Sequence, residues 1–108
     1  MNHGDIWTVA GGVYTSQPRL ALIIQDDRYD ATDSVTVLPV TSTVLDAPSL
    51  RVPFSASELS GLVRDSQIMI DKLATVRRDD VQDRVGCLTA AQLVGVERVL
   101  FVFLGLAG

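Results

Sequence analysis

The feature that most constrains the fold of this chain is a succession of short apolar or β-branched runs, each followed by residues typical of turns. The runs cover residues 6–9, 20–24, 34–38, 49–54 and 67–71. Their spacing, roughly 10–16 residues, predicts a compact antiparallel sheet or barrel. The run at 20–24 is continuously apolar, which is typical of a strand covered on both faces. Residues 72–76 either continue the last run or pair with it, and Pro53 indicates a sheet edge.

The clearest helix signal stands near the end of the chain. Thr89 and Gln92 have the spacing of a capping box. The apolar residues that follow fall on one helical face: Leu93, Val96, Leu100 and Leu104. Gly105 can end this helix in the left-handed conformation. We expect the helix to cover one face of the sheet, and shorter helical turns are predicted at residues 57–59 and 79–83.

The length and charge of the chain bound its function. With 108 residues and no repeat, linker or low-complexity tract, it is expected to form one domain over residues 1–108 with a single sizeable core. Nine basic residues against thirteen acidic ones give a net charge of -4. This balance argues against a broad positive surface for nucleic acid and leaves room for a small local patch of arginines.

Cysteine content and hydropathy predict a cytoplasmic protein. Cys87 is the only cysteine, so no intramolecular disulfide can form, which fits a reducing compartment. The N-terminus has no basic region followed by an apolar one, and we expect no signal peptide. The longest apolar run, residues 99–107, has nine residues against the ~20 that a membrane span needs. No membrane association is therefore expected.

Metal and cofactor signals are weak. The acidic cluster at residues 26–33 lacks the glycine and terminal glutamate of a calcium-binding loop and contains Arg28, so a solvated loop is the favoured interpretation. Gly11 and Gly12 are read as a turn rather than a phosphate loop, and the chain contains one histidine, His3. We predict no metal ion and no cofactor.

Two groups of side chains favour phosphate chemistry. Arg19 stands directly before an apolar strand, where its planar guanidinium can contact two phosphate oxygens and stabilise a developing phosphorane. Thr41, Ser42 and Thr43 follow another strand, and hydroxyls at a strand end can donate to a phosphate. Taken singly, Arg19 is more typical of a surface charge, and the hydroxyl run is more typical of a turn that satisfies its own backbone.

A third polar group precedes the strand at residue 68. Arg64 can pair with a phosphate, and Ser66 and Gln67 can contact base edges. Tyr14 can stack on an unpaired base, whereas Trp7, inside a strand, is more typical of the core.

Taken together and in order, these segments resemble the MazF/PemK family of toxin endoribonucleases. The resemblance rests on Gly4-Asp5-Ile6-Trp7, on Pro18-Arg19-Leu20-Ala21-Leu22-Ile23, on Val37-Leu38-Pro39-Val40-Thr41-Ser42, on Gly61-Leu62 and on residues 66–72. The order and spacing hold over nearly the whole chain. The resemblance implies a mainly β fold with helices (α+β), namely an SH3-like β-barrel of the CcdB/MazF type with a C-terminal α-helix.

The resemblance also implies an activity. The family cleaves single-stranded RNA without a metal, by attack of the RNA's own 2′-hydroxyl, leaving a 2′,3′-cyclic phosphate and a 5′-hydroxyl. Arg19 matches its catalytic arginine and Thr41 its catalytic threonine. The residues expected to bind RNA are Ser42, Arg64, Ser66, Gln67, Tyr14, Gln17 and Lys72. A homodimer and a cognate MazE-like antitoxin are the implied partners.

Two departures from the family pattern keep other interpretations open. Leu20 follows Arg19 where the family usually has proline, and Ser66 stands where some members carry a catalytic aspartate, with Asp65 one residue before it. A non-catalytic gyrase poison of the CcdB type is one alternative, although the Trp-Gly-Ile type of ending is missing here. An inactive binding module of the same fold is the other.

Overall fold

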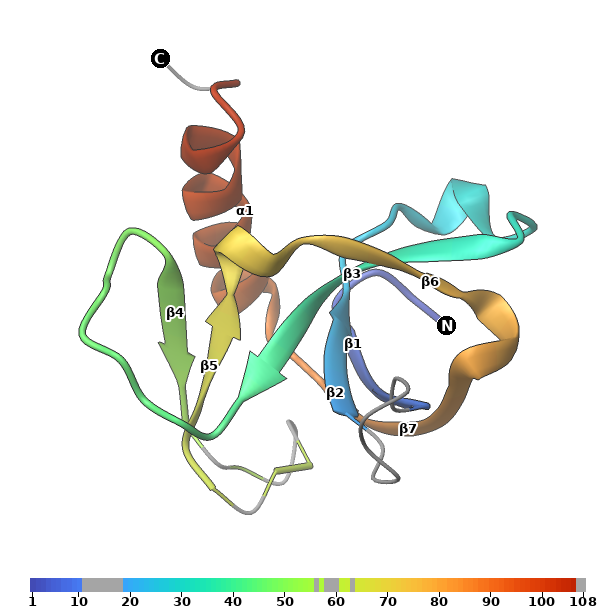
Figure 1. Ribbon diagram of the computed structural model, residues 1–108, viewed down its shortest axis with the longest axis horizontal. Coiled ribbons are helices and arrows are strands. Elements are labelled where there is room, and N and C mark those ends of the chain that lie inside the picture. The colour runs from blue at the N-terminus through green and yellow to red at the C-terminus, as the bar shows by residue number, and fades with distance from the viewer. Residues whose placement is uncertain (11–18, 56, 58–60, 63, 107–108) are drawn as a thin grey trace.

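The computed structural model describes residues 1–10, 19–55, 57, 61–62 and 64–106 (Figure 1). The strands are β1 (Asp5–Val9), β2 (Arg19–Ile23), β3 (Ser34–Thr41), β4 (Arg51–Phe54), β5 (Ser66–Met69), β6 (Ala74–Arg77) and β7 (Val81–Cys87). The helix is α1 (Ala90–Phe103), and the 3₁₀ turns are η1 (Asp27–Tyr29), η2 (Ile70–Lys72) and η3 (Arg78–Asp80).

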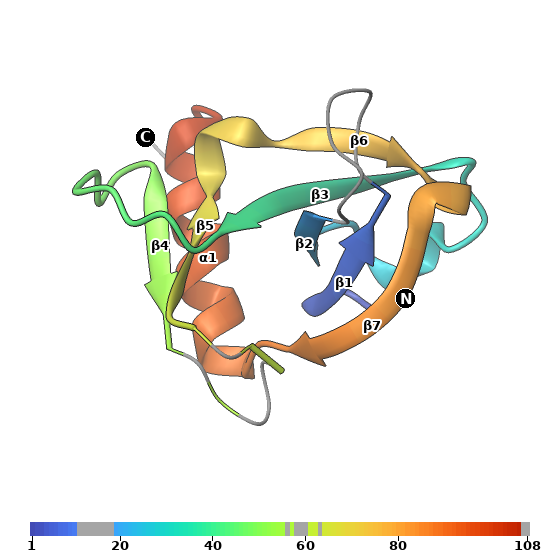
Figure 2. The same cartoon turned by 60° about the horizontal axis from the view of Figure 1, so that its bottom comes forward.

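All strand pairs are antiparallel, and the sheet follows the order β4-β5-β3-β2-β1-β7, with β6 also paired to β3. The long strand β3 carries two neighbours on one side, β6 along its first half and β5 at its end. The sheet curls, so that β7 at the far end of the order returns to β6 through η3 (Figure 2). The predicted antiparallel barrel is therefore confirmed, and β4 is an edge strand as Pro53 indicated.

Two hydrophobic clusters occupy the two faces of the curled sheet. Leu22 belongs to the larger cluster, with Ile6, Leu38 and Ile68, while its neighbours Ala21 and Ile23 belong to the smaller one. Side chains alternate across a strand, so a continuously apolar run supplies both clusters. The prediction that residues 20–24 form a strand covered on both faces is confirmed.

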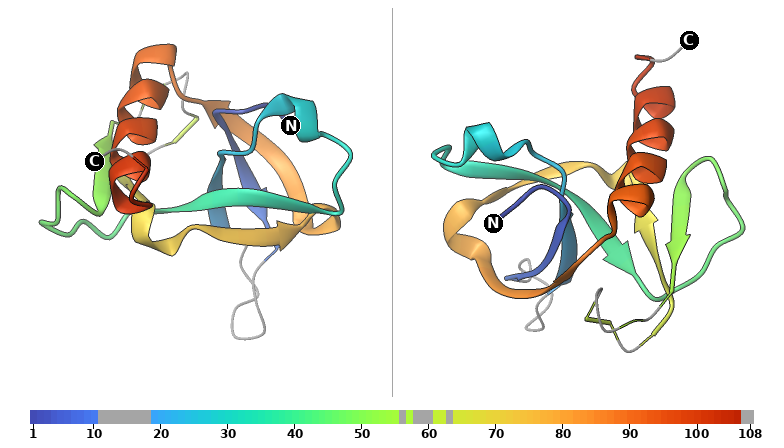
Figure 3. Two further views of the ribbon diagram at one scale, coloured as in Figure 1. Left: turned by 90° about the horizontal axis from the view of Figure 1, so that it is seen from above. Right: turned by 180° about the vertical axis from the view of Figure 1, so that it is seen from behind.

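Helix α1 closes the larger cluster at one side of the sheet, beside β4 and β5 (Figure 3). It begins with the predicted capping box. The backbone N–H of Gln92 donates to Thr89 Oγ1 at 3.1 Å, and the backbone N–H of Thr89 donates to Gln92 Oε1 at 2.8 Å. Val96 and Leu100 are buried against the sheet. Gly105 has a φ of 74°, as expected for a helix end. Leu104, predicted on the buried face, is 44% exposed.

The opening segment is fixed by a buried carboxylate. Asp5 is 6% exposed and accepts hydrogen bonds from the backbone N–H of Asn2 and from Trp7 Nε1. It also forms an ion pair with Arg84 of β7. Trp7 is half-buried against the smaller cluster rather than fully in the core. Asp5, part of the Gly4–Trp7 segment that resembles the family, therefore stabilises the contact between β1 and β7.

Strand β3 is longer than the predicted run at 34–38, because it continues through Pro39 to Thr41. Pro39 pairs with Ala21 of β2. Among the described residues, the other side of β3 pairs with β6 up to Val37 and with β5 from Val40 onward. Pro39 therefore lies where the sheet changes partner, and its missing N–H interrupts no registered pairing on that side.

Three further predictions about the second half of the chain need correction. Residues 72–76 do not pair with the strand before them: η2 turns the chain after Met69, and β6 pairs with β3 instead. The helical turn predicted at 79–83 is a short 3₁₀ turn that ends at Asp80, after which β7 runs to Cys87. β7 was not predicted because its middle residues, Gln82, Asp83 and Arg84, are polar and exposed. Ser57 lies in an isolated bridge with Leu62 rather than at a helical turn, and residues 58–60 lie outside the described residues.

No helix in the part of the chain that the structure describes is both long and apolar enough to cross a membrane.

Candidate active site

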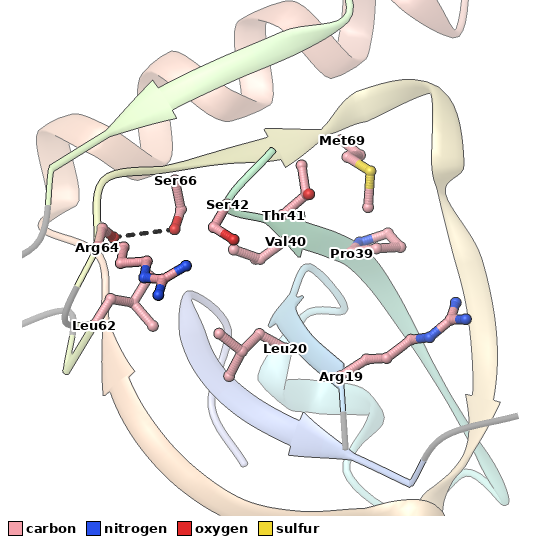
Figure 4. Close-up of a pocket in the computed structure, with 10 residues that line it drawn as sticks. All are labelled: Arg19, Leu20, Pro39, Val40, Thr41, Ser42, Leu62, Arg64, Ser66 and Met69. Atoms are coloured by element: carbon pink, nitrogen blue, oxygen red, sulfur yellow. Dashed lines mark hydrogen bonds between the residues drawn. The ribbon is translucent and has the colours of Figure 1, made fainter. Parts of the chain in front are cut away.

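A pocket of about 480 Å³ lies where β2 begins and β3 ends (Figure 4). We call it the main pocket. Its lining residues are Arg19, Leu20, Pro39, Val40, Thr41, Ser42, Leu62, Arg64, Ser66 and Met69. Five of the side chains singled out in the sequence, distant from one another along the chain, are thus brought to one cavity: Arg19, Thr41, Ser42, Arg64 and Ser66.

Arg19 is the first residue of β2. Its backbone is registered against Val9 of β1, which fixes the point from which the side chain starts. The side chain is exposed and extends along the pocket rim, with its guanidinium away from the Ser66 end (Figure 4). The next residue, Leu20, pairs with Val40 of β3 and lines the pocket with an apolar side chain. The leucine that replaces the usual proline therefore sits inside an ordinary, registered strand.

Thr41 is the last residue of β3 and is registered against Gln67 of β5. Its hydroxyl oxygen accepts a hydrogen bond from the Thr43 amide at 3.1 Å. A hydroxyl can accept and donate at once, so this bond orients the oxygen and leaves the Thr41 proton for a ligand. Ser42 is exposed beside it, and its hydroxyl points toward Arg64 (Figure 4).

Arg64 and Ser66 form the opposite end of the main pocket. The Ser66 hydroxyl donates to the Arg64 carbonyl oxygen at 3.1 Å, which shapes the turn that leads into β5. Arg64 is exposed, and its guanidinium points into the space below Ser42 (Figure 4). Among the described residues that line the main pocket, two are arginines and none is acidic. The pocket is therefore a local positive site on a chain whose net charge is -4.

Gln67 does not line the main pocket, and its expected contact with RNA stays a prediction. The side chain is 6% exposed. Its Nε2 donates to the Leu45 carbonyl oxygen at 2.9 Å, and its Oε1 accepts from the Leu45 backbone amide at 3.0 Å. Both ends of the side-chain amide are used, so Gln67 anchors the loop after β3.

Lys72, Tyr14 and Gln17 are the remaining residues that were expected to bind RNA. Lys72 is exposed on η2 and is not among the residues that line the main pocket. Tyr14 and Gln17 lie outside the described residues. Sequence reasoning missed Leu62 and Met69, which add apolar surface to the pocket. Nothing in their local pattern distinguishes them from core residues.

Two groups suited to metal binding or acid–base chemistry, His3 and Asp26, do not line the main pocket and have partners elsewhere. His3 Nδ1 lies 3.0 Å from the Ile24 carbonyl oxygen and its Nε2 lies 2.8 Å from Glu97 Oε1, so this ring ties the N-terminal segment to α1. The backbone amide of Arg28 lowers the pKa of the Asp26 carboxyl, which caps η1. Across the described residues, no three His, Cys, Asp or Glu side chains form a group that could hold a metal ion.

The arrangement is suited to a phosphodiester. Two guanidinium groups can neutralise phosphate charge from opposite ends of the main pocket, and hydroxyl donors lie between them. The apolar side chains of Leu20, Pro39 and Met69 separate these polar groups and offer surface to a sugar or base.

The chain matches known proteins over nearly its whole length. Residues 2–104 match the family described as PemK-like, MazF-like toxin of type II toxin–antitoxin system. The chain is 50% identical over 109 residues to a probable endoribonuclease MazF of Mycolicibacterium smegmatis, covering 100% of both proteins. It is 32% identical over 99 residues to endoribonuclease MazF6 of Mycobacterium tuberculosis, covering 87% of each.

Solved structures show the same fold. A mycobacterial endoribonuclease in complex with its cognate antitoxin superposes with a TM-score of 0.83 at 22% identity, over 100% of this chain and 98% of that chain. The Mycobacterium tuberculosis toxin MazF-mt6 superposes with a TM-score of 0.81 at 24% identity, over 96% and 99% respectively. These likenesses confirm the predicted CcdB/MazF-type fold.

Proposed function

The chain belongs to the PemK-like, MazF-like toxins of type II toxin–antitoxin systems, and we propose that it is a sequence-selective endoribonuclease that cleaves single-stranded mRNA without a metal ion. It acts in the cytoplasm as a single toxin domain over residues 1–108 and is neutralised by a cognate MazE-like antitoxin. The names of its relatives support the activity, since they are called endoribonucleases. A related structure holds a cognate antitoxin, which supports the partner.

The observation that carries the proposal is the composition of the main pocket. Arg19 and Arg64 lie at its two ends, Thr41 lies between them, and no described lining residue is acidic. A phosphodiester is the ligand that matches two guanidinium groups and a hydroxyl donor at once.

We assign the chemistry to the RNA's own 2′-hydroxyl. Its oxygen forms a bond to the adjacent phosphorus while the bond from phosphorus to the 5′ oxygen breaks, so the products are a 2′,3′-cyclic phosphate and a 5′-hydroxyl. The 2′-hydroxyl proton passes to water at the open mouth of the pocket, and the leaving 5′ oxygen gains a proton. Arg19 stabilises the phosphorane charge and supplies that proton, and the guanidinium, whose high pKa keeps it protonated, regains a proton from the water that accepted the one from the 2′-hydroxyl. Thr41 donates its hydroxyl proton to a non-bridging phosphate oxygen.

A homodimer is part of the proposal. Val94 of α1 and the C-terminal end of the helix, with the residue after it, are exposed and apolar: Val94, Phe101, Val102, Phe103 and Leu104 are each between 44% and 64% exposed. An apolar surface of this kind on a folded protein is typical of a contact with another chain. Sedimentation of the purified protein, with Phe101→Asp as the variant expected to give monomers, tests this part separately.

The activity is tested with a long RNA incubated with purified protein in EDTA. We expect discrete cuts whose ends can be labelled directly by a polynucleotide kinase, since each carries a 5′-hydroxyl. Arg19→Ala and Thr41→Ala should abolish the cuts while the proteins stay folded. Arg28→Ala is a matched control, because Arg28 is an exposed arginine in η1 that does not line the main pocket. Absence of cleavage across diverse RNAs, together with inhibition of gyrase, would favour the CcdB-like poison instead.

Salt dependence gives a second test. If only the two pocket arginines neutralise phosphates, log K should fall with log salt with a slope of about −1.4, from about 0.7 per phosphate on a single strand. A slope several times steeper would contradict a small local patch.

A further inference from the structure

A second pocket, of about 360 Å³, adjoins the main pocket through Ser66, which lines both. We call it the flanking pocket. Its lining residues are Val44, Pro53, Phe54, Ser55, Asp65, Ser66 and Gln67. It lies where the end of β4 meets the start of β5, since Phe54 is registered against Ser66 (Figure 1). Any chain that crosses the main pocket near Ser66 therefore reaches the flanking pocket next.

The two pockets differ in charge. The main pocket is lined by two arginines and no acidic residue, whereas the described residues that line the flanking pocket include Asp65 and no basic side chain. A carboxylate repels a phosphate group and accepts hydrogen bonds from N–H donors. The flanking pocket is thus suited to a neutral ring with donor groups on its edge, and the main pocket to an anion.

The walls of the flanking pocket combine a rigid floor with an exposed apolar rim. Phe54 is 7% exposed and packs in the larger hydrophobic cluster, so its ring is held in place. Val44 is 65% exposed on the loop after β3. The next residue, Leu45, donates its backbone N–H to Gln67 Oε1 and accepts from Gln67 Nε2 at its carbonyl oxygen, which fixes the loop beside the pocket. Covering Val44 with a ligand ring would bury apolar surface at little cost in loop ordering.

From this division of charge and this preformed wall, we propose that the flanking pocket binds one nucleobase of the RNA strand, next to the phosphate held in the main pocket. The base carries an exocyclic amino group, as in cytosine, adenine or guanine, which donates to the Asp65 carboxylate, while Val44 covers its face. This inference rests on the proposed endoribonuclease function and adds to it one determinant of sequence selectivity. Gln67 is a positioning residue for this pocket, acting through Leu45.

The test maps the cleavage sites of a randomised RNA pool by sequencing the fragments. For the wild-type protein we expect amino-bearing bases to be favoured over uracil at one position beside the cut. Asp65→Asn should reduce that discrimination roughly tenfold at that position alone, the order of size of one lost base contact. Val44→Ser should weaken RNA binding several-fold without moving the cut. Asp30→Asn, an exposed carboxylate that lines neither pocket, should match the wild type.

Different outcomes separate this inference from the proposed function. Cleavage with an unchanged base preference in Asp65→Asn overturns the subsite and leaves the endoribonuclease intact. If the wild type cleaves no RNA, the proposed function fails, and titration with a pool of single-stranded DNA then decides the subsite: moving Val44 methyl resonances support it, and unmoved ones overturn it. Flanking-pocket variants that lose affinity for the antitoxin or become monomeric, with RNA preference unchanged, would assign the pocket to a protein contact and also overturn the proposal.

Discussion

Replacing Thr41 with valine should separate catalysis from folding in this toxin. Valine keeps the β-branched shape that suits the end of β3, and it removes only the hydroxyl. The backbone register with Gln67 should therefore be unchanged. The substitution removes the proposed donor to the scissile phosphate and the acceptor for the Thr43 backbone amide.

The structure gives the expected sizes of the two effects. The amide of Thr43 lies in an exposed segment, so water can replace the lost acceptor, and the free energy of unfolding should fall by only about 0.5–1 kcal/mol. Loss of one preorganised donor to a developing oxyanion costs about 10²–10³ in rate, or about 3–4 kcal/mol. Thr41→Ser keeps the hydroxyl and should stay within about tenfold of the wild type.

The assay is single-turnover cleavage of a defined RNA oligonucleotide, with urea unfolding of the same preparations. A Thr41→Val protein that is folded and cleaves within threefold of the wild type would refute the role of the hydroxyl. Equal losses in Thr41→Ser and Thr41→Val would also refute it, because a variant that keeps the hydroxyl would then be as impaired as one that lacks it.

Three predictions concern the scaffold and are checked by urea unfolding. Asp71→Asn should lower the free energy of unfolding by about 2–4 kcal/mol, because it leaves the charge of Arg51, which is 9% exposed, without its partner. Arg51→Met should lower it by less, because the Asp71 carboxylate reaches solvent. A larger loss in Arg51→Met than in Asp71→Asn would contradict this reasoning. Gly61→Ala should lower the free energy of unfolding by more than about 2 kcal/mol, because the φ of Gly61 is +73° and a Cβ would lie 1.9 Å from the Val85 carbonyl oxygen. A urea midpoint equal to that of the wild type would disprove this prediction. Thr89→Ala should cost about 1 kcal/mol through loss of the helix cap, and an unchanged stability would argue against that cap.

The candidate site was only partly predictable. Arg19, Thr41 and Arg64 were candidate phosphate contacts from their positions beside predicted strands, but only the resemblance to a family gave Arg19 and Thr41 catalytic roles, because a lone arginine or threonine has no local pattern that distinguishes a ligand contact from a surface residue. Gln67 shows the limit of such reasoning. It is adjacent to Ser66 in sequence, but only the tertiary structure shows that its amide is used by Leu45. The flanking pocket has no sequence signature, since it is formed where β4, β5 and the loop after β3 meet.

Elements whose causes are local can be predicted from the amino-acid sequence. The capping box at Thr89 and the stop at Gly105 bound α1 through contacts within a few residues, and the two-sided apolar run at 20–24 needs only the alternation of a strand. The tertiary structure alone decided which strands pair. Polar β7 is a strand because β1 offers it backbone partners, and β6 joins β3 because η2 redirects the chain. Such pairings depend on groups that are distant in sequence, so the free energy of pairing cannot be inferred from a local sequence pattern.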